Sequence, residues 1–223
     1  MQSHKSALLA LGGRTTLFYV REINQRLRQQ TSAEMTRNVV LKKTNFEEIN
    51  KYLPNQFNEL EEIFDNQLTS LNDFQSVIVP NITAHETIDR LIERPDFSCP
   101  IVHPVSSVIA KLKSDGCDKI KLISSQYGMN SNYLNSYFMH NDIEVTVPDQ
   151  EDQIFFEEFR KKVYEFREKS SDVSQYISLL TNYQQDNKIV VACTELSLML
   201  PSVSKNIYDM SRVQIDQAIV NNQ

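Results

Sequence analysis

Residues 189–195 place three chemically distinct side chains directly after an apolar run. Ile189 to Ala192 are apolar, and Cys193, Thr194 and Glu195 follow before leucines resume. A thiol has an ordinary pKa near about 8.5, and a helix N-terminus or a nearby cation lowers it, so thiol and thiolate are both accessible near neutral pH. A buried strand that ends in these groups would present them at the edge of a parallel sheet, where ligands bind. The stretch is therefore a candidate site for a small ligand beyond the carboxyl end of the strand, with Cys193, Thr194 and Glu195 as the residues to examine.

A second stretch, residues 76–91, has the same layout as residues 188–203. Each has a short apolar run, then a polar cluster that contains a threonine, and then a segment with helical apolar spacing. In the second stretch the cluster includes Asn81 and Thr83, and a helix is expected to begin near Thr83. Chains with two such units often fold as two similar lobes, and the helix N-termini would offer N–H groups to a carboxylate. The shared layout of the two stretches predicts that Cys193 and residues 81–83 face each other across a cleft.

The elements that would position these residues alternate along the chain. Apolar runs typical of strands alternate with segments of helical apolar spacing, a pattern that predicts βαβ units and parallel sheets. We expect an α/β protein with six to eight strands, in two similar lobes of parallel sheet flanked by helices. The first lobe would comprise residues 1–100 with 205–223, and the second residues 101–204. Strands are expected within 6–13, 37–46, 76–80, 99–104, 119–125, 143–148 and 188–193, with a long helix at 151–169.

Composition excludes several classes of protein. The chain has 223 residues, 40% of them hydrophobic and 23% charged, and a formal net charge of −6. An acidic balance argues against a general nucleic-acid binder, and no apolar run approaches the length of a membrane span. Residues 7–13 are too short an apolar segment for a signal peptide and are better interpreted as the first strand. The three cysteines are scattered, which predicts reduced thiols and a cytoplasmic location. The four histidines are too dispersed to suggest a metal site.

Four segments together resemble the cofactor-independent aspartate/glutamate racemases over nearly the whole chain. "LGG…TTLFYVREIN" resembles that family's opening Gly-Gly loop and the helix after it, and "PNITAH" resembles its P-C-N-T-A-H motif. The stretch 100–134 matches the layout of its middle strand-helix-strand segment. "ACTELSLML" resembles its G-C-T-E-L motif, the most specific of the four.

The resemblance implies a racemase or epimerase that uses two bases and no cofactor. One cysteine thiolate would remove the α-proton of a bound amino acid, and a thiol on the opposite face would return a proton. Substrate would contact Gly12, Gly13, Thr16, Asn81, Thr194 and Glu195. The resemblance also implies a small amino-acid or carboxylate ligand and a homodimer.

The chain departs from the family pattern at the first cysteine. Asn81 occupies that position and Ile82 the position of the family's asparagine, while Pro80 and residues 83–85 keep the pattern. An amide is not a general base at ordinary pH, so Cys193 would be the single catalytic thiol, with Thr83 or a water in the second role. The loop after Gly13 is also shorter than the family's, and Ala192 replaces a glycine. Three hypotheses follow: a one-cysteine racemase, a single-thiol enzyme such as a decarboxylase, and a non-catalytic protein that binds a small acid or a partner chain.

Each candidate residue also has a purely structural interpretation. Cys193 could be a buried strand-end thiol, and Glu195 a first-turn acid favoured by the helix dipole. Thr83 could be a helix N-cap, and Gly12 and Gly13 could simply permit a tight turn. His85 is interpreted as structural or solvent-facing, and Cys99 and Cys117 as packing residues. The charges of helix 151–169 are typical of a solvated face, although Arg160, Lys161 or Lys162 could reach a substrate carboxylate.

Overall fold

The computed structural model describes residues 6–30, 39–201 and 204–220, which form two compact units. Unit 1 comprises residues 1–103 and 214–223, and unit 2 comprises residues 104–213. The second boundary falls inside helix α11 (Met210–Val220). Residues 204–213 belong to unit 2 because strand β7 (Ile207–Asp209) pairs in parallel with β6 (Lys188–Ala192).

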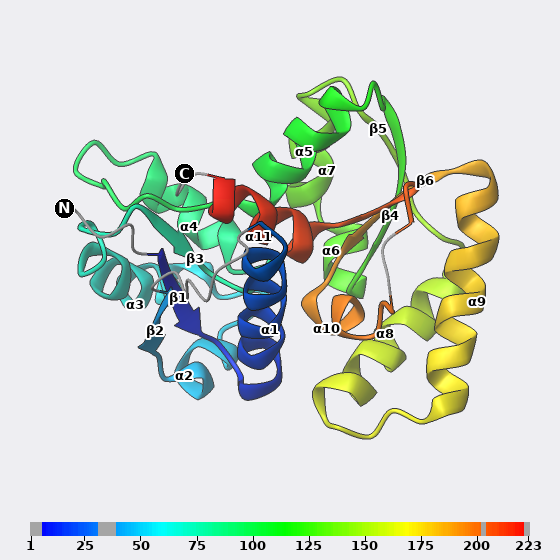
Figure 1. Ribbon diagram of the computed structural model, residues 1–223, viewed down its shortest axis with the longest axis horizontal. Coiled ribbons are helices and arrows are strands. Elements are labelled where there is room, and N and C mark those ends of the chain that lie inside the picture. The colour runs from blue at the N-terminus through cyan, green and yellow to red at the C-terminus, as the bar shows by residue number, and fades with distance from the viewer. Residues whose placement is uncertain (1–5, 31–38, 202–203, 221–223) are drawn as a thin grey trace. The chain divides into compact units, whose positions relative to one another are not determined.

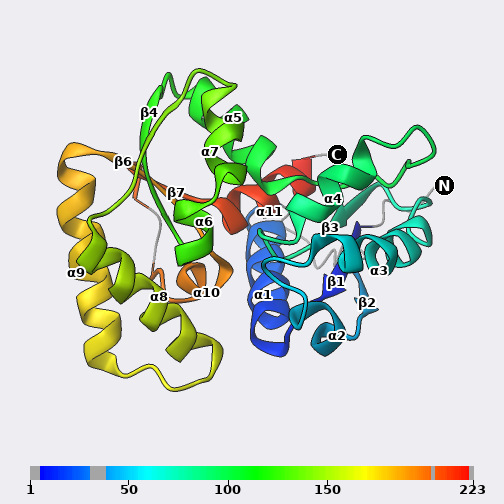
Figure 2. The same cartoon turned by 180° about the vertical axis from the view of Figure 1, so that it is seen from behind.

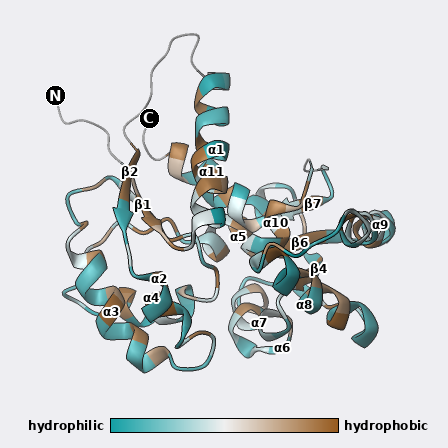
Figure 3. Cartoon of the chain, turned by 90° about the horizontal axis from the view of Figure 1, so that it is seen from below, coloured by the Kyte–Doolittle hydropathy of each residue, from teal (hydrophilic) through white to brown (hydrophobic). Residues whose placement is uncertain are grey.

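Unit 1 is built on a three-stranded parallel sheet of order β2-β1-β3. The central strand β1 (Ser6–Ala10) pairs with β2 (Val39–Lys43) and with β3 (Ser76–Ile78) (Figure 1). Its apolar side chains are buried on both faces, as expected for a strand covered by helices, and β1 has hydrophobic colour in Figure 3. The helices of this unit are α1 (Gly13–Gln30), α2 (Phe46–Asn50), α3 (Phe57–Thr69) and α4 (His85–Ile92).

Unit 2 is built on a four-stranded parallel sheet of order β5-β4-β6-β7. Strand β4 (Lys119–Ser124) pairs with β5 (Glu144–Thr146) on one side and with β6 on the other. Its helices, besides the first residues of α11, are α5 (Pro104–Ser114), α6 (Gln126–Asn130), α7 (Asn132–Met139), α8 (Gln150–Tyr164), α9 (Ser170–Asp186) and α10 (Thr194–Leu198). Helices α8 and α9 lie beside each other in both Figure 1 and Figure 2.

The core of unit 2 joins β6 to α8, α9 and α10. Buried Phe156 and Phe159 of α8 lie in one cluster with Tyr176 of α9, and the same cluster holds Val191 and Cys193. The rings of Phe159 and Tyr176 are 4.9 Å apart between centroids, so aromatic packing fixes the two helices against the strand end. Cys193 therefore lies in a core cluster that contains three aromatic side chains.

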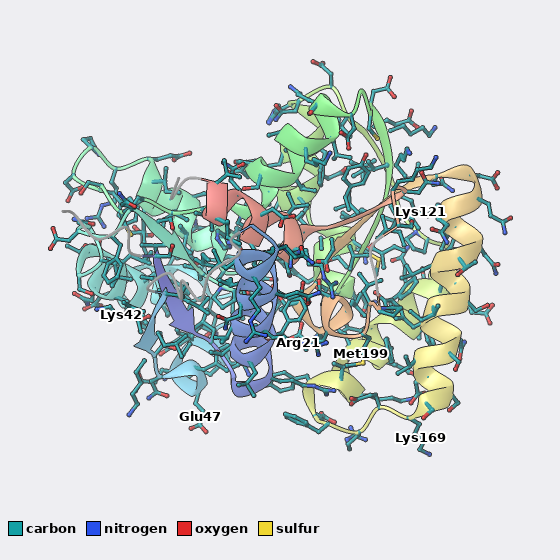
Figure 4. All side chains as sticks on the ribbon, in the orientation of Figure 1. Arg21, Lys42, Glu47, Lys121, Lys169 and Met199 are labelled. Atoms are coloured by element: carbon teal, nitrogen blue, oxygen red, sulfur yellow. The ribbon has the colours of Figure 1, made fainter. Side chains whose placement is uncertain are left out.

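The α/β class with two parallel sheets flanked by helices is confirmed, with seven strands in the described part of the chain. Residues 99–104 do not form a full strand and contribute one isolated bridge, Ile101 to Val77. The helix expected at 151–169 is present but ends five residues early. α8 ends at Tyr164, Phe166 has φ +57°, and α9 begins at Ser170, after Lys169, which Figure 4 labels.

Within the described ranges, no helix combines the length and the apolar character that crossing a bilayer requires.

Candidate functional site

Cys193 lies where β6 passes into α10. It is the N-cap residue of that helix, with extended backbone (φ −151°), and its thiol donates a hydrogen bond to Glu195 Oε2 at 3.2 Å. The Cys193 carbonyl accepts from the Ser197 N–H at 2.9 Å and from the Ser197 hydroxyl at 3.1 Å, so the first turn of α10 is closed upon it. The side chain is only 6% exposed. The predicted grouping of thiol and carboxylate is thus present, and Thr194 is buried beside them.

The environment of Cys193 favours the neutral thiol. Burial raises its pKa well above the ordinary value, and the negative charge and hydrogen bond of Glu195 act in the same direction. The Arg160 guanidinium and the Leu196 backbone N–H lower the pKa, but they do not overcome burial. The thiol therefore carries its proton at neutral pH and donates it in a hydrogen bond to the Glu195 carboxylate.

Hydrogen bonds to four neighbouring elements, β4, α9, β7 and α11, hold the β6–α10 junction. The Ser124 hydroxyl at the end of β4 donates to the Ala192 carbonyl at 2.6 Å, and the Tyr176 hydroxyl of α9 donates to the Leu196 carbonyl at 3.1 Å. The Ser197 hydroxyl donates to Asp209 Oδ1 at 2.6 Å, and Arg212 donates to the carbonyls of Ser197 and Leu200. α10 ends at its C-cap residue Met199, labelled in Figure 4. These contacts leave the backbone around Cys193 little freedom.

Of the three basic residues of α8 proposed for carboxylate binding, Arg160 is paired with Glu157 of the same helix, and its charge lowers the pKa of the Cys193 thiol. Its charge interacts with both Cys193 and Glu195. Lys162 instead forms an ion pair with Asp172 at 2.7 Å, and Lys161 is 57% exposed. The expectation that this helix presents only a solvated charged face is wrong here, because Glu157, the partner of Arg160, is buried. The i,i+3 spacing of the two residues was visible in the sequence, but the burial of the carboxylate was not.

In unit 1, the predicted glycine loop forms a tight turn between β1 and α1. Gly12 has φ +76°, a backbone conformation that favours glycine, whereas Gly13 is the first residue of α1. The Thr16 hydroxyl donates to the Gly12 carbonyl at 2.7 Å, and the Thr16 N–H donates to the same oxygen at 3.0 Å. The structure therefore brings Gly12, Gly13 and Thr16 together, and the Thr16 side chain holds the turn.

Asn81 shapes the loop before α4 through its own side chain. Its Oδ1 accepts the Ala84 N–H at 3.0 Å, and its carbonyl lies 2.8 Å from His85 Nδ1. α4 begins at His85, two residues later than expected. Its N-cap residue is Ala84, so the interpretation of Thr83 as the N-cap is wrong: Asn81 provides the hydrogen bond that a capping threonine would have made. Thr83 is half-buried within this loop.

His85 is a structural residue and not a solvent-facing one. Its side chain is fully buried, its ring packs edge-on against His103 with centroids 4.9 Å apart, and burial lowers its pKa to about 3. Cys99 is buried as expected, with its pKa raised to about 12, whereas Cys117 is only partly buried and its thiol donates to the Lys119 carbonyl. All three cysteines are free thiols. The described residues contain no group of three histidine, cysteine or acidic side chains that could hold a metal ion.

The sequence of the chain matches one protein-family model over residues 8–218, that of the Asp/Glu/Hydantoin racemases. The chain belongs to this family. The match includes β6 and α10 with Cys193, and also the glycine loop and the Asn81 loop. No curated protein matches the chain by sequence.

Solved racemase structures share the fold of this family member. An aspartate racemase homologue from Pyrococcus horikoshii OT3 superposes with a TM-score of 0.83 at 17% identity, with 99% of each chain covered. Aspartate racemase from Picrophilus torridus gives 0.74 at 15% identity, covering 97% of this chain and 93% of that one. Glutamate racemase from Francisella tularensis, solved with D-glutamate, gives 0.60 at 11% identity, covering 99% and 81%.

Sequence reasoning did not single out the residues that support the β6–α10 junction. Ser124, Tyr176, Asp209 and Arg212 lie in segments interpreted only as strands or helices. Their roles depend on which elements pack together, and no local pattern marks them. That Cys193 and residues 81–83 face each other stays a prediction.

Proposed function

We propose that this family member is a pyridoxal-independent isomerase of an acidic amino acid in which Cys193 is the single cysteine that transfers the α-proton. One observation carries the proposal: a buried thiol at the end of a parallel strand donates its hydrogen bond to the Glu195 carboxylate at 3.2 Å. Family membership supplies the reaction class, racemisation of aspartate- or glutamate-type amino acids.

The geometry supports a definite order of proton movements at Cys193. The resting thiol is neutral, so it is ready to donate a proton to a substrate carbanion, and the thiolate left behind would face Glu195 and Arg160. For abstraction, the thiol proton passes to Glu195, and the thiolate then takes the α-proton of the amino acid. General acid–base catalysis of this kind contributes about 10²- to 10⁴-fold in rate.

In the first unit, the proposed partner residue is Thr83, alone or with a water. Asn81 is excluded as a general base by its chemistry, and its amide oxygen is already bound to the Ala84 N–H. Thr83 is half-buried in the same loop. A hydroxyl is a far weaker base than a thiolate, so we expect exchange of the α-proton to be faster than inversion. Substrate binding is assigned to Gly12, Gly13, Thr16, Asn81, Thr194 and Glu195.

The chain has a cysteine after β6 but Asn81 at the position of the family's first cysteine, and this difference favours a second candidate function that also uses one thiol. A single thiol suffices for a reaction that needs protonation on one face only, such as decarboxylation of a small acid. The observation that favours it is that the position of the family's first cysteine is occupied by Asn81, whose Oδ1 serves the loop backbone.

The test follows deuterium incorporation and optical rotation separately, with L- and D-aspartate and L- and D-glutamate in deuterated water. We expect exchange of the α-proton in the wild type and its loss in Cys193→Ser. Cys117→Ser should retain the exchange, and it is a matched control because that thiol lies in the same unit and donates a hydrogen bond to the Lys119 carbonyl. Thr83→Ala should lose inversion and keep exchange. Binding of an acidic amino acid without exchange in any variant would refute the proposal and favour a non-catalytic binding protein.

Assembly and location complete the proposal. We expect a homodimer in the cytoplasm, in keeping with family membership and with three free thiols. Light scattering coupled to size exclusion tests the first point, because a monomeric mass at micromolar concentration contradicts it.

A further inference from the structure

Helix α10 is too short to keep its shape through its own hydrogen bonds. It spans five residues, Thr194–Leu198, and isolated helices shorter than about 12–15 residues are marginal in water. Cys193 is its N-cap residue and Glu195 lies in its first turn, so the 3.2 Å hydrogen bond between thiol and carboxylate depends on this turn. Contacts from other elements must therefore keep α10 folded.

The end of β7 lies beside the end of β6 and supplies a buried carboxylate. The parallel register pairs Asp209 with Val191, so Asp209 and Cys193 leave the sheet at the same edge. The Asp209 side chain has no exposed surface, and its Oδ1 accepts the Ser197 hydroxyl at 2.6 Å and the Ser211 N–H at 3.1 Å. A hydrogen bond to a charged acceptor is about twice as strong as one between neutral groups. Ser197 of α10 is thereby tied to the end of β7.

Arg212 of α11 holds the other end of α10. It forms an ion pair with Asp209, and its terminal nitrogens donate to the carbonyls of Ser197 at 3.3 Å and Leu200 at 3.2 Å. These carbonyls lie at and just after the C-terminal end of α10, where the helix itself offers no donor. The Arg212 side chain is 11% exposed, so solvent does little to screen the pair. Asp209 and Arg212 thus hold one short helix at two points.

We propose that Ser197, Asp209 and Arg212 form a latch that keeps the first turn of α10 in place, and that they are positioning residues for Cys193. Without the latch α10 would unwind locally, and Cys193, which is 6% exposed in the folded protein, would open to solvent and separate from Glu195. The Cys193 carbonyl accepts the Ser197 N–H at 2.9 Å, and this bond connects the latch to Cys193. The inference rests on the proposed function for its catalytic meaning alone, because the latch itself needs no substrate.

The test measures how fast iodoacetamide alkylates Cys193 at pH 8 without substrate, read on the Cys193 peptide by mass spectrometry over a range of low urea concentrations. A buried thiol reacts from an opened state, so the rate reports how often that state forms. Ser197→Ala removes a hydrogen bond to a carboxylate and should speed alkylation about tenfold. Local opening of α10 exposes little surface, so the faster rate should change little with urea, whereas unfolding of a whole unit depends steeply on it.

Arg212→Lys is the second variant. It keeps a positive charge opposite Asp209, so it avoids an unpaired buried carboxylate, which would destabilise the whole protein. A single ammonium cannot replace the planar guanidinium at both carbonyls, those of Ser197 and Leu200. Alkylation should therefore speed up about threefold to tenfold, again with a shallow dependence on urea.

Tyr208→Phe is the matched control. It also removes a hydroxyl hydrogen bond between β7 and a carboxylate of the same unit, that of Tyr208 to Asp115 at 3.0 Å, but this bond is not part of the latch. Its alkylation rate without urea should equal that of the wild type. A rate within twofold of wild type in Ser197→Ala overturns the inference. Equal acceleration in Ser197→Ala and Tyr208→Phe, or acceleration with the steep urea dependence of whole-unit unfolding, also overturns it, because either result marks a general loss of stability.

The deuterium-exchange assay tests the positioning role separately. Where the wild type exchanges the α-proton, Ser197→Ala should lower kcat about tenfold and leave KM within twofold, because the latch positions the thiol and does not bind substrate. A raised KM with unchanged kcat contradicts a positioning role. Because alkylation uses no substrate, it tests the latch even where the exchange assay refutes the proposed function, and the two failures are distinguishable.

Discussion

Replacement of Gly128 by alanine tests the packing that holds the β6–α10 junction. Gly128 is in α6, and a Cβ built there would overlap the Ser124 hydroxyl and lie 3.0 Å from Ser124 Cβ. That hydroxyl donates to the Ala192 carbonyl at 2.6 Å, one residue before Cys193. On helix propensity alone, alanine would stabilise this position by about 1 kcal/mol. The structure predicts the opposite sign.

The magnitude follows from two costs. Overpacking of a buried site costs about 1–3 kcal/mol, and loss of the Ser124 hydrogen bond about 1 kcal/mol. After subtraction of the gain in propensity, Gly128→Ala should destabilise the protein by about 1–3 kcal/mol. Ser124→Ala alone should cost about 1 kcal/mol, because it removes the hydrogen bond without a clash.

Urea unfolding followed by circular dichroism, with all four members of the double-mutant cycle, provides the assay. In the Ser124→Ala/Gly128→Ala double mutant the overlapping hydroxyl is absent, so its loss of stability should be smaller than the sum of the single losses by about 1 kcal/mol. An increase in the urea midpoint of Gly128→Ala, or strict additivity in the cycle, would refute the reasoning.

Two further predictions concern unit 1. The pKa of His85 is about 3 in the folded protein and about 6.5 in the unfolded chain. Between these pH values the unfolded state binds more protons, so the free energy of unfolding should fall as the pH drops from 6.5 toward 3. His85→Gln should flatten that fall in urea midpoints measured from pH 7 to pH 4, and an unchanged slope would contradict it. Gly12→Ala should cost about 1 kcal/mol because of its φ of +76°. Gly13→Ala, where a Cβ has no neighbour within 4 Å, should be neutral when both variants are compared by urea unfolding, and equal losses of stability would show that φ is not the cause.

Local sequence patterns determined the secondary-structure class and the position of the thiol. Apolar runs such as 188–192 form strands because burial on both faces of a parallel sheet requires continuous apolar side chains, and the alternation with helices then requires parallel pairing. The polar residues after such a run must lie at its carboxyl end, so the placement of Cys193, Thr194 and Glu195 was predictable. Gly12 was predictable for a similar reason, because a Gly pair after a first strand indicates a turn.

Tertiary packing decided the chemical state of those residues. Whether Cys193 is a thiol or a thiolate depends on its burial and on the charges of Glu195 and Arg160, and Arg160 comes from a helix more than thirty residues earlier in the chain. The role of Asn81 as the hydrogen-bond acceptor for the Ala84 N–H required the loop coordinates, because the sequence equally allowed Thr83 to cap the helix. The sequence marks Glu157 as a surface acid, whereas in the fold it is buried and accepts the Gln126 N–H of α6, which packs against α8. Electrostatic environment is a sum over groups brought together from distant segments, and for that reason the sequence located the site while the fold determined its protonation.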